Sequence, residues 1–568
     1  MKPISVLSCL LFSLLILVSC RRAEAERTDM QAEHIRMNQV GYPRTATKEF
    51  LVAGLPAQSF RIRNARGRTV ARGRLEDRGV WEASGEGLLR GDFSRVKRPG
   101  RYTVLLNTGL ESAPFVVMDD VYDAPLRAAA KSFYFQRASL AVDVRYGDVF
   151  EREAGHPDLQ CTYHPSSGRN AGTHYSPGGW YDAGDYGKYV VNGALSVGQM
   201  LNLLELDPGV LPDGSLSIPE GGNGKGDLLD ELRYELDWLV TMQDTDGGVF
   251  HKLTTLDFEG FVMPEQATGE RYVIGKGTAA TLDFAAVMAQ ASRVYAATDP
   301  DWSRAILYSA RDAWNWAMAH ADSAFSNPPD VHTGEYGDRV FDDDFYWAAA
   351  ELFLSTGDEK YRTHLTGHPQ PYGHRTSNSW KYFVRNTAFH SLLLHPDRCG
   401  ADLWESLKKS HLDLAGQLLH AQDSIPGGIG LEEFAWGSNS DVLNQAMILC
   451  MAHHLDGNPE FLEGARRNLD YVLGMNATGV CYLTGFGSRP VMNPHHRPSG
   501  ADNNVAPVPG FVVGGPNAGM QDRQVVRYES DRPAKAFEDV QESYASNEVC
   551  LNWNAPAVFV LAYLDTNR

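Results

Sequence analysis

The chain has 568 residues, 43% hydrophobic and 22% charged, which is the composition of a folded globular protein with room for more than one core. Its 71 acidic and 52 basic side chains give a net charge of -19, and no Lys/Arg-rich run offsets the repulsion of phosphate backbones. This balance argues against nucleic acid as a partner and suits a neutral polymer such as a polysaccharide.

Residues 1-25 have the features of a lipoprotein-type signal peptide and tether. A lysine precedes an apolar run from about Val6 to Val18 that is too short to span a bilayer comfortably. Leu17-Val18-Ser19-Cys20 resembles the bacterial lipobox, which implies cleavage before Cys20 and a lipid on its thiol, whereas ordinary cleavage near Ala25 is the alternative. We therefore expect a secreted protein, lipid-anchored at the bacterial cell envelope or surface, with no other membrane contact.

Residues 32-118 contain short alternating apolar stretches, such as "SFRIRN" and "GRYTVLLN", separated by Gly, Pro and charged turns. This pattern predicts a small β-sandwich. Near residue 120 the apolar period changes from two to about 3.6, so we place a domain boundary there and a second, helical domain over 121-568.

The helical domain is predicted to contain about twelve helices with no strong strand between them. An even number of antiparallel helices indicates a toroid of α-hairpins, although a right-handed solenoid would give the same pattern. The predicted helices are 123-140, 186-207, 226-244, 276-296, 300-320, 342-355, 357-365, 380-395, 401-422, 440-455, 458-474 and 545-566.

A long Gly/Pro/Asn-rich section, from "ATGVCYLTGFGSRPVMNPHHRPSGADNN" through "PGFVVGGPNAGMQD", has little periodicity. A loop of this length inside a compact domain favours a functional role. Five cysteines beyond Cys20 form no CxxC pair and are odd in number, so they predict small buried side chains rather than a disulfide framework. They are Cys161, Cys399, Cys450, Cys481 and Cys550.

Two aspartates, Asp182 and Asp185, lie in "GGWYDAGDYGKYV" just before a predicted helix. Gly184 between them indicates a tight turn that lets both carboxylates face one cavity. From residue types alone a helix cap is an equally good interpretation. A calcium loop is a third, but the alternating oxygen donors of such a loop are missing.

A glutamate, Glu548, lies in "FEDVQESYASNEVCLNWNA" among Tyr544, Val549 and Trp553. It could be a helix first-turn residue stabilised by the dipole. Apolar surroundings resist ionisation of a carboxyl, and a carboxyl that stays protonated can act as a general acid. Paired with an ionised aspartate, it would supply the two groups that glycoside hydrolysis needs.

The segment "NPHHRPSG" places His495, His496 and Arg497 in the long loop. These side chains suit sugar hydroxyls, metal ligation or a polar loop. Adjacent histidines on non-helical chain do not usually share one metal ion, which favours hydroxyl binding over zinc.

Together these three motifs resemble glycoside hydrolase family 9, formerly cellulase family E, in its branch with an N-terminal immunoglobulin-like module. "IRMNQVGYPRTATKEFLV" resembles the start of that module. The resemblance implies an all-α (α/α)6 barrel behind the β-sandwich. It also implies inversion at the anomeric carbon, and so catalytic carboxyl groups roughly 6.5-9.5 Å apart.

The resemblance also assigns roles to individual residues. Asp185 would be the base that activates water, Asp182 would hold that water, and Glu548 would be the general acid. His495 and Arg497 would contact the sugar, and Asp539 would be a further site residue.

Aromatic rings offer flat surfaces to the C-H faces of pyranoses, so Trp436, Tyr544 and Trp180 are candidate subsite walls, although each could equally be core. His496 is a further candidate sugar contact.

Metal sites are expected to differ from those of some relatives, which bind a structural zinc through two cysteines and two histidines. Ala138 and Thr162 stand at two of these positions, and only Cys161 and perhaps His174 remain, so we expect no zinc there. Calcium is common in the family, and Asp227, Asp230 and Glu231 are candidate ligands, although a helix's acidic first turn explains them equally well. The chemistry itself requires no cofactor.

The sequence therefore predicts an inverting endo-β-1,4-glucanase acting on plant cell-wall β-glucans. Exo-acting enzymes of the same family, namely a cellodextrinase, a β-glucosidase or an exo-glucosaminidase, are the nearer alternative. A non-catalytic glycan-binding lipoprotein is the remoter one, and the intact acid and base pair argues against it.

Overall fold

The computed structural model describes residues 33-367 and 384-568. The predicted signal peptide and Cys20 lie outside the described residues, as does the start of the helix predicted over 380-395. Within the described part of the chain, no helix has the length and apolar character of a membrane span.

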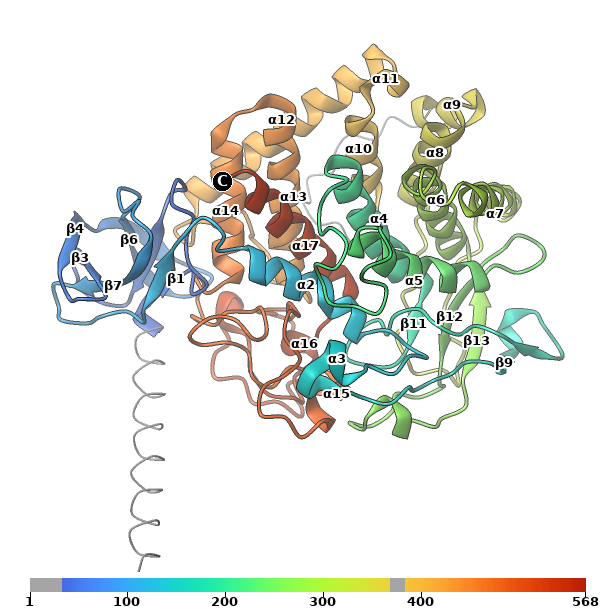
Figure 1. Ribbon diagram of the computed structural model, residues 1–568, viewed down its shortest axis with the longest axis horizontal. Coiled ribbons are helices and arrows are strands. Elements are labelled where there is room, and N and C mark those ends of the chain that lie inside the picture. Colours follow the sequence, from blue (N-terminus) through green and yellow to red (C-terminus); the bar gives the residue numbers. More distant parts are fainter. Residues whose placement is uncertain (1–32, 368–383) are drawn as a thin grey trace, which may run out of the picture.

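The N-terminal domain is a β-sandwich that stands beside the helical domain (Figure 1). One sheet has the strand order β1-β2-β6-β5 and the other β4-β3-β7-β8, and every pairing in both sheets is antiparallel. Phe50, Phe60 and Phe115 are among the rings that fill the space between the sheets. The strands are β1 Ile35–Met37, β2 Glu49–Ala53, β3 Ser59–Asn64, β4 Thr69–Arg74, β5 Glu76–Trp81, β6 Glu86–Asp92, β7 Gly100–Leu106 and β8 Phe115–Val117.

The second domain is an (α/α)6 barrel, as predicted, and the described residues contain twelve helices of nine residues or more. Six inner helices are buried over most of their length: α4 Val190–Leu206, α6 Thr278–Val294, α8 Asp342–Thr356, α10 Arg385–Leu394, α13 Ser438–Asp456 and α17 Leu551–Thr566. Six outer helices cover them: α2 Asp123–Phe135, α5 Asp227–Thr241, α7 Pro300–Ala319, α9 Glu359–Gly367, α12 Ala401–Ser424 and α14 Pro459–Val472. Because α17 packs on both α2 and α4, the last helix closes against the first, and the solenoid alternative is wrong.

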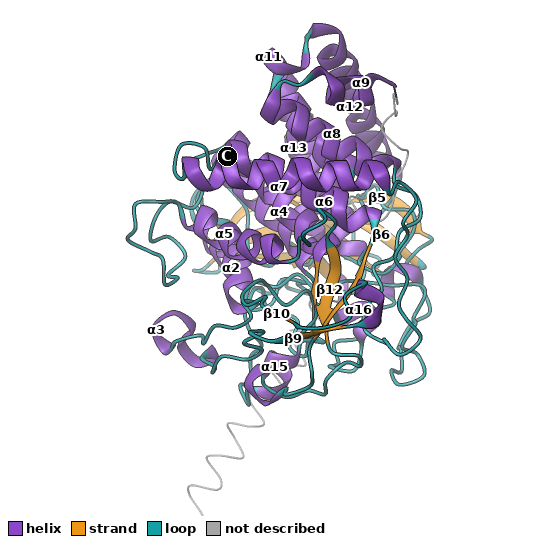
Figure 2. Cartoon of the chain, turned by 90° about the vertical axis from the view of Figure 1, so that its right-hand side faces the viewer, coloured by secondary structure: helices purple, strands orange, loops and turns teal. Residues whose placement is uncertain are grey.

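The barrel also carries a five-stranded sheet that the sequence did not predict. Its order is β10-β9-β13-β12-β11, and its strands are short: β9 Cys161–Tyr163, β10 Thr173–His174, β11 Lys188–Tyr189, β12 Phe250–Thr254 and β13 Tyr272–Lys276. Strands of two to five residues leave too few alternations to detect. Figure 2 shows the sheet on the same side of the barrel as α15 (Arg497–Ala501), α16 (Tyr544–Asn547) and most long loops. The remaining short helices are α3 Val144–Gly147 and α11 Pro396–Cys399.

Two predicted helices are interrupted next to the motif residues. The helix predicted over 545-566 is split into α16 and α17, and Glu548 between them has an extended backbone with φ -70° and ψ 154°. The helix predicted from residue 186 begins only at Val190, because Lys188 and Tyr189 pair with β12. Both interruptions place motif residues in extended chain that can pair with other segments.

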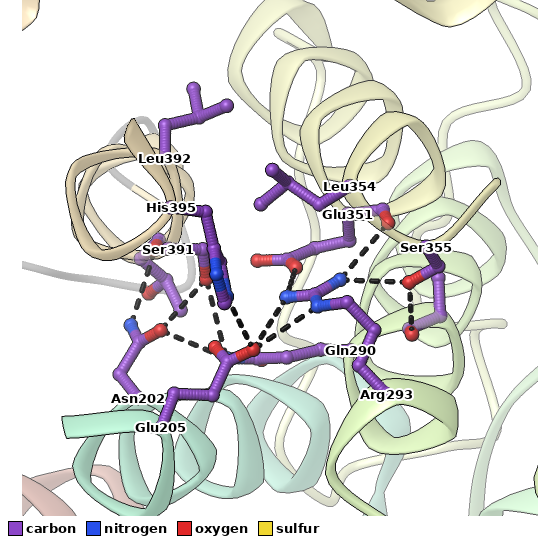
Figure 3. Close-up of polar contacts among 12 residues, drawn as sticks. Asn202, Glu205, Gln290, Arg293, Glu351, Leu354, Ser355, Ser391, Leu392 and His395 are labelled. Atoms are coloured by element: carbon purple, nitrogen blue, oxygen red, sulfur yellow. Dashed lines mark hydrogen bonds and ion pairs between the residues drawn. The ribbon is translucent and has the colours of Figure 1, made fainter. Parts of the chain in front are cut away.

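A buried polar network joins four inner helices near the C-terminal ends of α4 and α6 (Figure 3). Arg293 of α6 forms ion pairs with Glu205 of α4 and Glu351 of α8, and His395 after α10 contacts Glu205 at 3.0 Å. Glu205 follows Val190 by fifteen residues, so at 1.5 Å per residue it lies about 22 Å along α4 from that helix's first turn. The network therefore stabilises the barrel at a distance from the motifs that precede α4.

The two domains meet through polar contacts that include a buried carboxyl. Asn38 of the sandwich donates its Nδ2 hydrogen to Asp470 of α14 at 2.6 Å, and Asp470 is 5% exposed. Burial raises the pKa of Asp470 to about 8, and the Asn38 hydrogen bond only partly opposes that. At neutral pH the folded protein therefore favours the protonated carboxyl.

Asp470→Asn should make the stability of the protein less dependent on pH between about pH 5 and pH 8. An unfolded aspartate has a pKa of about 3.9, so raising the folded-state pKa costs the wild type up to about 1.4 kcal/mol per pH unit between the two values. Asparagine keeps an acceptor for Asn38 and cannot ionise. We expect the free energy of unfolding in urea to shift in favour of the variant between about pH 5 and pH 8. A difference that does not change with pH would contradict this interpretation of Asp470.

Candidate active site

The three motifs are joined by backbone pairing. Arg497 N donates to Gly184 O at 3.1 Å, and His495 N donates to Asn547 O at 2.9 Å, so His495 forms a parallel bridge with Glu548. Gly184 must be glycine, because a Cβ there would lie 2.1 Å from the His495 carbonyl oxygen. Residues separated by more than 300 positions thus meet in one place.

This junction forms one wall of an open cavity of about 840 Å³. The aspartate pair, the glutamate and the histidine-arginine segment all face it, together with several aromatic rings. Its lining includes Asp182, Asp185, Tyr189, Phe258, Tyr336, Trp436, His495, Arg497, Tyr544, Glu548 and Cys550.

Asp185 is held by two donors at the floor of the cavity. Its Oδ2 accepts from Gly187 N at 2.9 Å and from the Tyr189 hydroxyl at 3.3 Å, and the side chain is 6% exposed. Both donors stabilise an ionised carboxylate. A carboxylate that keeps this orientation while facing the cavity can take a proton from water.

Asp182 is more deeply buried, at 1% exposed. Its Oδ1 accepts from Asn192 Nδ2 at 2.6 Å, and its Oδ2 accepts from the Tyr336 hydroxyl. Burial, and next the negative charge of Asp185, raise the pKa of Asp182 to about 7. The two aspartates therefore differ in environment, although only Ala183 and Gly184 separate them.

Glu548 is partly buried beside the same pair. Burial and the Asp185 carboxylate raise its pKa well above the usual range, which Arg497 only partly opposes. Because the protonated form is favoured, Glu548 can donate a proton at a pH where an ordinary glutamate would be ionised. Asp185 and Glu548 thus place a carboxylate held by two donors and a carboxyl whose protonated form is favoured at one cavity.

His495 and Arg497 both line the cavity. The His495 Nδ1-H donates to Gln541 O at 2.7 Å, and burial lowers the pKa of this imidazole to about 4, so it is neutral. Arg497 donates to Gly184 O at 2.7 Å and to Glu259 O at 2.8 Å, which fixes its guanidinium. Both groups are held by backbone carbonyls and are suited to binding hydroxyls.

Two of the three predicted aromatic walls are at the cavity. The rings of Trp436 and Tyr544 lie 5.6 Å apart with 35° between their planes, and Trp436 is 43% exposed. Trp180 is 1% exposed, packs on Phe133 and donates its indole N-H to Glu231, so the prediction that it is a subsite wall is wrong.

Two further predicted site residues, His496 and Asp539, lie next to the cavity-lining residues but do not line the cavity themselves. His496 is 1% exposed, and its ring nitrogens lie 2.9 Å from Ser499 Oγ and 3.2 Å from Gln136 Oε1, so it cannot contact a sugar. Asp539 accepts from Met492 N and Asn493 N, both at 2.8 Å, and so stabilises the turn before His495 without lining the cavity. The prediction of substrate binding by His496 is wrong, and Asp539, predicted as a further site residue, lies outside the cavity lining.

The three candidate calcium ligands do not fit a common ion. Glu231 forms an ion pair with Arg137 at 3.0 Å, and Asp227 accepts from the backbone amides of Gly214 and Leu216. Asp230 accepts from an asparagine side chain. Among the described residues no group of three or more His, Cys, Asp or Glu side chains has the geometry of a metal site. These three residues therefore act as local hydrogen-bond and ion-pair partners.

At the zinc position, Cys161 and His174 face each other across the β9-β10 pair. Ala138 and Thr162 supply neither a thiolate nor an imidazole. The residues present do not fit a four-ligand zinc site. All five cysteines beyond Cys20 are buried, as expected of small core side chains.

Three residues at the site carry no motif that would predict their role. They are Tyr336 and Asn192, which donate to Asp182, and Phe258, which lines the cavity. Tyr336 lies in an irregular segment and has a left-handed backbone with φ 47°, and its only sequence signal is the pair of glycines, Gly334 and Gly337, that flank Glu335 and Tyr336. Asn192 lies in the mostly apolar helix α4, and a buried polar side chain in such a helix indicates that it bonds a buried polar group, here Asp182. Phe258 is 48% exposed at the cavity, and an isolated aromatic in a loop carries no pattern.

A helical barrel whose cavity is lined by two carboxyl groups in different environments is the arrangement of a glycoside hydrolase. Residues 122-561 match the family model described as glycosyl hydrolase family 9, and residues 30-109 match the cellulase N-terminal ig-like domain. The chain belongs to glycoside hydrolase family 9.

Relatives cover nearly the whole chain. A xyloglucan-specific endo-beta-1,4-glucanase of Bacteroides ovatus is 40% identical over 560 residues, which are 94% of this chain and 93% of the relative. A cellodextrinase of Butyrivibrio fibrisolvens is 31% identical over 547 residues, which are 93% and 99% of the two chains. A solved structure of AaCel9A with cellobiose-like isofagomine has a TM-score of 0.86 at 35% identity and covers 94% of this chain and all of its own.

Proposed function

We propose that the protein is an inverting, endo-acting β-1,4-glucanase. The observation that carries the proposal is that Asp185, held by two hydrogen-bond donors, and Glu548, whose protonated form is favoured by burial, face one open cavity. Glu548 protonates the leaving glycosidic oxygen while Asp185 takes a proton from the attacking water. Asp182 orients that water, His495 and Arg497 bind sugar hydroxyls, and Trp436 and Tyr544 stack on pyranose faces.

Xyloglucan is the first substrate to test, because the relative with 40% identity over nearly the whole chain is named for it. An exposed tryptophan and an exposed phenylalanine at an open cavity suit a polymer whose rings bind along its length. The name of the cellodextrinase relative, at 31% identity, keeps short oligomers as the second candidate.

The test is reducing-sugar release and viscosity on xyloglucan, mixed-linkage glucan, carboxymethylcellulose, chito-oligosaccharides and cello-oligosaccharides. Endo-action is expected to lower the viscosity of a polymer before much reducing sugar appears. Release of short products at constant viscosity would establish exo-action instead. No hydrolysis of any of these substrates would support the non-catalytic glycan-binding alternative.

We also propose that the protein is secreted and anchored by a lipid on Cys20, on the basis of the lipobox resemblance. Radiolabelled palmitate should enter the protein expressed in a bacterial host, and Cys20→Ala should remove both the label and the membrane association. Equal labelling of wild type and variant would contradict the assignment.

A further inference from the structure

Lys252, in the middle of β12, is a buried cation outside the three motifs. Its side chain is fully buried, and its ammonium donates to Asn327 Oδ1 at 2.7 Å, to Thr333 Oγ1 at 3.0 Å and to Gly334 O at 2.7 Å. No carboxylate of the described residues lies within ion-pair distance of it, 4.0 Å. Burying an ammonium is costly unless its hydrogens are all bonded. Here all three main acceptors belong to one irregular segment, 327-334.

That segment leads directly to both aspartates of the active site. Gly334 N donates to the Tyr189 hydroxyl at 3.1 Å, and the same hydroxyl donates to Asp185. Two residues further on, the Tyr336 hydroxyl donates to Asp182. The position of Gly334 therefore fixes the Tyr189 hydroxyl that donates to Asp185, and the position of Tyr336 fixes the hydroxyl that donates to Asp182.

The segment needs external support to keep this shape. Tyr336 has φ 47°, a backbone conformation that non-glycine residues adopt only when their surroundings impose it. Bonds from β12 supply that support: besides Lys252, His251 contacts Glu335 O at 2.8 Å and Thr254 contacts Thr333 at 3.0 Å. Lys252 lies between these two contacts and is the charged member of the row.

We propose that Lys252 is a positioning residue for hydrolysis: its ammonium holds the segment from Thr333 to Tyr336 against β12, so that Tyr336 and Gly334 keep Asp182 and Asp185 in their working orientation. The proposal rests on the hydrolytic function proposed above. Burial lowers the pKa of Lys252 to about 7, and the Asp185 carboxylate is the main charge that opposes the shift. The Asp185 carboxylate therefore favours the charged form of Lys252.

Lys252→Met tests the proposal, because methionine fills a similar volume without charge or donors. We expect kcat to fall about 30-fold with KM within about twofold, since the sugar-binding side chains are untouched. Lys276→Met is the matched control. Lys276 lies on the neighbouring β13 and forms ion pairs with Asp244 and Asp246 away from the cavity, so its variant should keep wild-type kcat.

A cycle with the Tyr189→Phe/Tyr336→Phe double variant separates positioning from general loss of stability. If Lys252 acts through the two hydroxyls that bond Asp185 and Asp182, Lys252→Met should cost less than about threefold in kcat when both hydroxyls are already removed. Equal losses in both backgrounds, or wild-type kcat in Lys252→Met, would overturn the proposal. If Lys252→Met does not fold, Lys252→Arg replaces it, because arginine keeps the charge and the donors. A folded Lys252→Arg whose kcat is more than about 30-fold below that of the wild type would also overturn the proposal.

These ratios are measured on whichever glycoside the wild type hydrolyses. If the wild type hydrolyses no β-1,4-glucan, the proposed function is contradicted. If Lys252→Met has the same kcat as the wild type, only the role of Lys252 is contradicted. Circular dichroism and thermal unfolding establish that each variant compared is folded.

Discussion

Glu548→Gln should lower kcat on a β-1,4-glucan by about 10²-10⁴-fold, the usual contribution of a general acid. Glutamine has the same shape but cannot give up a proton to the leaving oxygen. Initial rates of reducing-sugar release measure the loss, and thermal unfolding should show little change in stability. Glu542→Gln is the matched control, because Glu542 is an exposed acid six residues earlier in the same motif.

The pH profile gives the same prediction a second readout. Burial and Asp185 raise the pKa of Glu548, and the acid works in its protonated form, so wild-type activity should persist well above the ordinary glutamate pKa of about 4.3 and fall as pH rises further. The residual activity of Glu548→Gln should lack that alkaline fall. Near-wild-type rates in Glu548→Gln would remove Glu548 from the mechanism.

Asp185→Asn is expected to have an effect of similar size, about 10²-10⁴-fold in kcat, with KM little changed. The amide oxygen of asparagine can still accept from Gly187 N and Tyr189, so the loop keeps its shape while the base is lost. Asp237→Asn, on the exposed face of α5, is the control for the same chemical change.

Steady-state rates on the best substrate measure the loss, and binding of a cello-oligosaccharide by calorimetry shows whether the cavity is intact. If Asp185→Asn binds and turns over substrate like the wild type, another group must activate the water.

The architecture was predictable because it depends on long periodic patterns. Twelve amphipathic or wholly apolar stretches give the barrel, and short alternating ones give the sandwich. The aspartate pair, Glu548, His495 and Arg497 were recognisable because their motifs occur in order along the chain. The family-model match and the solved relatives confirm the family and the fold.

Other features depend on tertiary contacts that no local pattern encodes. No Gly or Pro separates Ala545 from the apolar run that begins at Val549, so the pattern predicts one helix, whereas the pairing of Glu548 with His495 and of Cys550 with Ala183 interrupts it. Trp180 and His496 belong to the motifs, but the sequence does not show that they face the core. Tyr336 and Lys252 are linked to Asp182 only because β12 packs against the irregular segment 327-336 in the folded protein.

The most direct test of the central claim is the configuration of the first product. Asp185 acting on water and Glu548 on the leaving oxygen require a single displacement, so ¹H NMR during early hydrolysis of a β-linked glucan should show the α-anomer before mutarotation. Early accumulation of the β-anomer would require a covalent intermediate and would contradict the assignment of Asp185 as a base.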